Sequence, residues 1–62
     1  MRKVLVIFPA KKDTKINSKI LVAMRGKKSG ILPLEKNLNK IIGKTLKKNI
    51  NNMTEFSWDM IK

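Results

Sequence analysis

The chain of 62 residues contains no cysteine and no histidine. Without cysteine it forms no disulfide, and without either residue it lacks the usual ligands of a structural zinc ion. The same absences remove the commonest general base and the thiol nucleophile. Carboxylates come only from four acidic residues: Asp13, Glu35, Glu55 and Asp59. We therefore expect no metal, no cofactor, no small-molecule substrate and no enzymatic activity.

Long hydrophobic runs are also missing. The apolar runs at 4–8 and 20–24 are far shorter than the roughly 18 residues that a membrane span needs. The first run follows Arg2 and Lys3, as in a signal peptide, but Lys11 and Lys12 stand where a small-residue cleavage site is required. We interpret 4–8 as a core strand, and the absence of cysteine favours a reducing intracellular compartment, the cytoplasm or an organelle matrix.

Positive charge is what the chain has in excess. Fifteen lysines and arginines against four acidic residues give a formal charge of +11. Because like charges at this density oppose a compact state, we expect a polyanionic partner. Lysine outnumbers arginine, and lysine suits phosphate neutralisation better than the reading of bases. A genome rich in A and T would give the same lysine and asparagine bias without functional meaning.

The runs at 4–8 and 20–24 are rich in branched residues and bounded by Pro9 and Gly26, which predicts two strands of a hairpin. Neither run alternates, so both strands are expected to be covered on both faces. The connection at 9–18 is long for a hairpin. We interpret it either as a basic arm that is ordered by a partner or as a solvated connection.

The hairpin would sort the cations into two sets. Our first candidates for phosphate contacts lie at the open end, where the glycines of the 25–30 turn permit an anion-binding nest: Arg2, Lys3, Arg25, Lys27 and Lys28. The second set belongs to the long connection: Lys11, Lys12 and Lys15. The turn lacks the glycine that a P-loop requires before its Lys-Ser pair, which excludes nucleotide hydrolysis of that type.

Residues 33–50 have the spacing of an amphipathic helix opened by Pro33. The apolar positions are Leu34, Leu38, Ile41, Ile42, Leu46 and Ile50. Lys36, Lys40 and Lys44 lie on the opposite side and extend the candidate nucleic-acid surface, although such a face often serves only solvation. Gly43 is an unfavourable residue in a helix interior, by about 1 kcal/mol relative to alanine.

The segment 51–62 differs from the basic body at 1–50, because it carries a formal charge of −1 from Glu55, Asp59 and Lys62. Residues 55–60 alternate polar with apolar, which favours a short edge strand, and a helix capped by Thr54 is the alternative. A strand would present Phe56, Trp58 and Met60 together as a partner-binding surface. The predicted fold is therefore a small single α+β domain: a β-hairpin, one amphipathic helix and a short C-terminal strand, in the order ββαβ.

These features favour a small basic protein that binds RNA phosphates as a structural component of a ribonucleoprotein assembly such as the ribosome, next to a neighbouring subunit. RNA is favoured over DNA. One alternative is a phage-type or regulatory protein that binds DNA or an acidic host protein. A further alternative is a membrane-surface binder that uses the helix at 33–50, although we do not expect a membrane partner.

Overall fold

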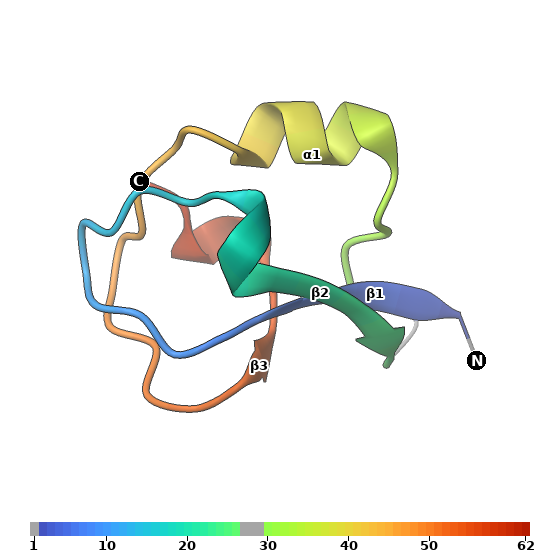
Figure 1. Cartoon of the computed structure of the whole chain (residues 1–62), viewed down its shortest axis with the longest axis horizontal. Helices are drawn as coiled ribbons and strands as arrows, with labels where there is room; N and C mark the ends of the chain where they lie inside the picture. The colour runs from blue at the N-terminus through green and yellow to red at the C-terminus, as the bar shows by residue number, and fades with distance from the viewer. Residues whose placement is uncertain (1, 27–29) are drawn as a thin grey trace.

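The computed structural model describes residues 2–26 and 30–62. Three strands form one antiparallel sheet in the order β2-β1-β3, and a single α-helix lies over one face of it (Figure 1). The small α+β domain predicted from the sequence is confirmed. In chain order the elements are β1 (Lys3–Ile7), the 3-10 helix η1 (Ser18–Ile20), β2 (Leu21–Arg25), α1 (Glu35–Ile41), β3 (Thr54–Glu55) and the 3-10 helix η2 (Trp58–Met60).

The central strand β1 is the most buried element of the fold. It pairs with β2 from Lys3↔Arg25 to Ile7↔Leu21, so the predicted hairpin is confirmed. All of its residues from Val4 to Ile7 are buried, as a run without alternation indicates for a strand covered on both faces. The same expectation is wrong for β2, which lies at the sheet edge and is exposed from residue 23 to residue 25.

The predicted helix at 33–50 is wrong beyond its first half, because α1 ends at Ile41. Gly43 has a φ of +91°, a left-handed conformation that ends helices and that favours glycine. Its N–H donates to the carbonyl of Ile16 at 2.9 Å, and the chain then makes isolated bridges at Thr45, Leu46 and Ile50, with a bend at 47–48. Leu46 and Ile50 are buried all the same, so the apolar spacing identified core residues but not their backbone conformation.

The long connection after β1 is not an arm that waits for a partner. It pairs with residues 43–50 through isolated bridges, Ala10↔Ile50 and Lys15↔Thr45. The N–H of Ile50 donates to the carbonyl of Ala10 at 2.7 Å, and Ile16 between the two bridges is fully buried. The chain itself therefore orders this connection, and both of our readings of it as a free segment are wrong.

The segment after residue 53 contributes to the core. The N–H of Phe56 donates to the carbonyl of Leu5 at 2.8 Å, and the side chains of Phe56 and Met60 are buried. Trp58 is 48% exposed, because the strand ends at Glu55 and η2 turns this side chain outward. The three side chains therefore do not form one surface, and only Trp58 is available for contact with a partner.

Gly26 and Gly30 each lie close against Val4 of β1. A Cβ atom at Gly26 would lie 2.4 Å from Cγ2 of Val4, and one at Gly30 would lie 2.6 Å from Cγ1 of the same residue. Beyond them, the carbonyl of Ile31 accepts a hydrogen bond from the N–H of Leu5 at 2.8 Å. The glycine at position 26 thus serves packing, and a left-handed φ is not its reason. The predicted nest belongs to the turn at 25–30, whose residues 27–29 lie outside the described residues.

Candidate nucleic-acid interface

Most of the exposed cations in the described chain lie at opposite ends of the hairpin, along a molecule that is 31 Å in its longest dimension. At the open end, Lys3 pairs directly with Arg25, and the carbonyl of Arg2 accepts the N–H of Gly26 at 3.3 Å. The structure therefore brings together Arg2, Lys3 and Arg25, as predicted. Lys27 and Lys28, which were assigned to the same set, lie outside the described residues.

The opposite end, which we call the loop end, consists of residues 10–16, 43–50 and 61–62. It lies at the opposite end of the horizontal axis of Figure 1 from the start of β1. Backbone hydrogen bonds join its three segments, from the N–H of Asp13 to the carbonyl of Leu46 at 2.9 Å and from the N–H of Lys62 to the carbonyl of Thr45 at 2.9 Å. Three segments that are separate in sequence thus form one surface, with Asp13 bonded to a residue 33 positions away and Thr45 to one 17 positions away.

This surface collects lysines that the sequence distributes over the whole chain. They are Lys11, Lys12, Lys15, Lys44, Lys47, Lys48 and Lys62, and all seven are exposed. The nearby acids are Asp13 and Asp59, so seven lysines against two aspartates leave five positive charges. Lys47, Lys48 and Lys62 were not among the predicted contacts, because no local pattern shows that residues 44–48 and 62 meet.

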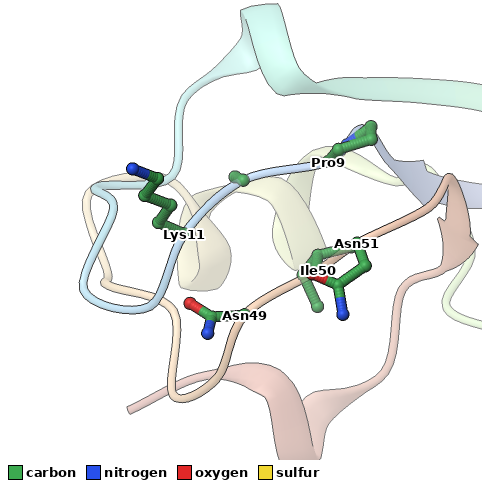
Figure 2. Close-up of a pocket in the computed structure, with 6 residues that line it drawn as sticks. Pro9, Lys11, Asn49, Ile50 and Asn51 are labelled. Atoms are coloured by element: carbon green, nitrogen blue, oxygen red, sulfur yellow. The ribbon is translucent and has the colours of Figure 1, made fainter.

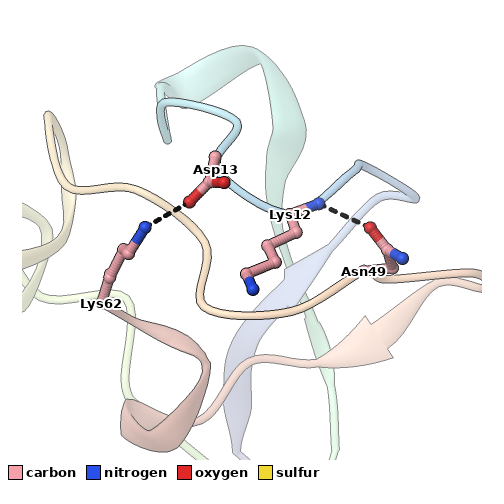
Figure 3. A network of polar contacts seen from close by, with 4 residues as sticks. All are labelled: Lys12, Asp13, Asn49 and Lys62. Carbon is pink, nitrogen blue, oxygen red and sulfur yellow. Dashed lines mark hydrogen bonds and ion pairs between the residues drawn. The ribbon is translucent and has the colours of Figure 1, made fainter.

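Asp13 of the loop end and the nearby Asp59 are both held as carboxylates. Lys62 donates to Asp13 at 2.6 Å, and this hydrogen bond is the main cause of the lowered pKa of Asp13 (Figure 3). The hydroxyl of Ser57 donates to Asp59 and lowers the pKa of that carboxyl, with a smaller contribution from Lys48 at 3.8 Å. Across residues 2–26 and 30–62, the other lysines of the loop end have no ion pair.

A tight turn fixes the position of two of these free lysines. The N–H of Thr14 donates to the carbonyl of Lys11 at 3.1 Å, and Asp13 takes the left-handed φ of 70° that the third position of a type II turn requires. The N–H of Lys12 donates to Oδ1 of Asn49 at 2.7 Å (Figure 3). Because the backbone under these cations is already ordered, less entropy is lost when they bind an anion.

A shallow depression of about 450 Å³ opens beside this turn. Pro9, Ala10 and Lys11 line one side, and residues 49–51 line the other (Figure 2). Ala10 and Ile50 contribute an aliphatic surface, while the amides of Asn49 and Asn51 supply donors and acceptors. Such a depression next to lysines can receive an unstacked base, while the lysines contact the phosphates of the same nucleic-acid strand.

The predicted lysine face of the helix is divided between two places. Lys36 and Lys40 are exposed on α1, whereas Lys44 follows the end of that helix and belongs to the loop end. The interfacial helix proposed for a membrane surface does not form, because Ile41, Leu46 and Ile50 are buried in the protein core. Of the described helices, none has the length and apolarity to cross a membrane.

The acidic residues of the described ranges do not gather in threes or more, as a metal site would require. Comparison of the chain with known protein families, with curated proteins and with solved structures gives no match. The interpretation of the site therefore depends on its geometry and charge.

Proposed function

We propose that the protein binds the phosphate backbone of nucleic acid, with RNA favoured over DNA, as a structural component of a ribonucleoprotein assembly such as the ribosome. It performs no catalysis in this proposal and acts in a reducing intracellular compartment. The observation that supports it is the loop end, where hydrogen-bonded segments hold seven lysines together against two aspartates.

The physical basis is counterion release. Each phosphate that a lysine neutralises frees a condensed cation, so binding weakens steeply as salt rises. Five lysines of the loop end form no ion pair within the described chain and are the first candidates for this role: Lys11, Lys12, Lys15, Lys44 and Lys47. Lysine acts as a point charge without the bidentate geometry that reads a guanine edge, so we expect little sequence preference.

The test is a fluorescence-anisotropy titration of labelled single-stranded RNA at salt concentrations between about 50 and about 200 mM. Five phosphate contacts predict a slope of about −3.5 for log K against log salt on a single strand. If the protein does not bind RNA at the lowest salt, or if the slope of log K against log salt is near zero, the proposal is contradicted. Tighter binding of duplex DNA at matched salt favours instead the alternative of a DNA-binding regulatory protein.

A pair of variants with equal net charge tests the site itself. The triple variant Lys11→Gln, Lys15→Gln, Lys44→Gln removes three free cations of the loop end, and Lys19→Gln, Lys36→Gln, Lys40→Gln removes three exposed cations elsewhere. We expect the first to reduce the salt slope by about 2 and the second to change it little. An equal reduction in both variants shows that overall charge, and not the loop end, binds the RNA.

A further inference from the structure

The outer edge of β2 offers backbone hydrogen bonds to a partner. Within the described chain, β2 has a neighbouring strand on one side only. The N–H and carbonyl of Leu5 bond to Ile31 and Phe56 on the far side of β1, so the pair Leu5↔Ala23 exchanges no hydrogen bonds. The N–H and carbonyl of Ala23 therefore point away from the sheet, and those of Arg25 do the same.

This edge lacks the features that usually prevent strand addition. Edge strands are commonly protected by charged residues, proline or a bulge. Residues 21–24 contain neither charge nor proline, and their pairing with β1 is continuous. Met24 is 45% exposed, and Phe8 next to the start of β2 is 37% exposed.

An apolar groove runs along the same edge. It has a volume of about 200 Å³ and lies between β2 and the chain around α1, with Leu21, Ala23, Pro33 and Leu38 among its lining residues. Side chains of an added strand would alternate between the faces of the sheet. Every second side chain would therefore enter this groove, while the others would lie beside Met24.

The positive charge around β2 indicates which kind of added strand this edge would bind. No acidic residue occurs between Asp13 and Glu35, and the exposed cations Lys19 and Arg25 frame β2 at its two ends. A second copy of this chain would bring another formal charge of +11 to the same place. We propose that the outer edge of β2 binds, by strand addition, an extended segment of another protein in which apolar residues are flanked by acidic ones.

The probe is a short blocked peptide in which alternating valine and threonine are flanked by glutamates on both sides. We expect the peptide to shift and protect from hydrogen exchange the amides of Ala23 and Arg25 in the full chain. A peptide with lysines in place of the glutamates should bind roughly tenfold more weakly or worse, because like charges oppose it. Equal binding of the two peptides, or protection elsewhere only, overturns the proposal.

A variant of the edge provides the decisive comparison. Ala23→Pro removes an outward N–H without removing a bond to β1, and Ala23→Ser keeps that N–H. We expect Ala23→Pro to weaken the peptide roughly tenfold and Ala23→Ser to weaken it little, with folding of both checked by amide spectra. If Ala23→Pro does not fold, the exchange protection in the unmodified protein still decides the question.

Two further measurements distinguish the acidic segment from a second copy of the chain at this edge, and the strand-addition proposal from the RNA proposal. Protection of the β2 amides that rises with protein concentration, without peptide, identifies a second copy as the occupant and refutes the acidic segment. RNA affinity should be the same in Ala23→Pro as in the unmodified chain, because the loop end lies away from β2. Failure of peptide binding with intact RNA binding, or the reverse, therefore rejects one proposal and leaves the other standing.

Discussion

The substitution Gly26→Ala tests the close passage of the chain over β1. The new Cβ would lie 2.4 Å from Cγ2 of Val4, a separation that real Cβ atoms essentially never show. Val4 is fully buried in the central strand, so it has no free space to enter. The other close atoms belong to the carboxyl end of Glu55, at 3.0 Å and beyond, which is a flexible side chain. The clash with Val4 therefore decides the effect.

We expect Gly26→Ala to lower the free energy of unfolding by about 1–3 kcal/mol, the range for overpacking of a dense core. Val4→Ala alone should lower it by about 2 kcal/mol, since it removes two buried methyl groups and leaves a cavity. In the double variant the clashing methyl is absent. The combined loss should therefore be smaller than the sum by about 1–2 kcal/mol.

Urea unfolding followed by far-ultraviolet circular dichroism measures these differences. Gly43→Ala is the matched control, because no atom lies within 4 Å of a Cβ at that position. Its effect should add to that of Val4→Ala within about 0.5 kcal/mol. Val4→Ala should rescue Gly30→Ala less than it rescues Gly26→Ala. The new Cβ at position 30 lies 2.7 Å from Cβ of Val4, and an alanine at position 4 keeps that atom. Additivity of Gly26→Ala with Val4→Ala would show that the passage over Val4 is not close.

Three further predictions concern the end of α1, the C-terminal segment and the loop end. Gly43→Ala should destabilise by about 1–2 kcal/mol through its left-handed φ alone, and Gly43→Asn by clearly less; equal losses in urea unfolding contradict this. Phe56→Ala should destabilise by about 3–5 kcal/mol and abolish most of the native circular dichroism, whereas Trp58→Ala should change the unfolding midpoint little; similar losses contradict our assignment of Trp58 to the surface. In the folded protein the pKa of Asp13 lies below its ordinary value of 3.8. The ionised Asp13 therefore stabilises the fold fully at pH values above 3.8, and this stabilisation is lost as the pH falls through the pKa of the folded state. In low salt, the melting temperature of Asp13→Asn should therefore fall less at acid pH than that of the unmodified protein. Asparagine is chosen because it tolerates the left-handed φ at this position. If the melting temperature of the variant depends on pH as that of the unmodified protein does, the ion pair between Asp13 and Lys62 is contradicted.

The sequence predicted those parts of the fold that depend on local signals. Short runs of branched apolar residues gave both strands of the hairpin, and their continuity at Val4–Ile7 indicated burial on both faces. The prediction of the helix was wrong where two local signals conflicted. Apolar spacing extended the predicted helix to residue 50, although Gly43 is unfavourable in a helix interior, and in the structure the helix ends before this glycine.

The loop end was only partly predictable, because it depends on contacts between distant segments. Lys11, Lys12 and Lys15 drew attention as a charged cluster in a long connection. Lys47, Lys48 and Lys62 join them only because residues 10–16 pair with 43–50 and Lys62 bonds to Thr45. Asp13 also carried no local signal for its ion pair, since its partner lies 49 residues further along the chain.

The position of β1 at the centre of the sheet sets the order in which the molecule assembles. This strand precedes its partners in the sequence, and its second edge is covered only when Ile31 and residues 54–55 pair with it. Such nonlocal pairing slows folding, because long loops must close before their contacts are gained. Until these distant segments pair with it, the apolar strand Val4–Ile7 is open to aggregation.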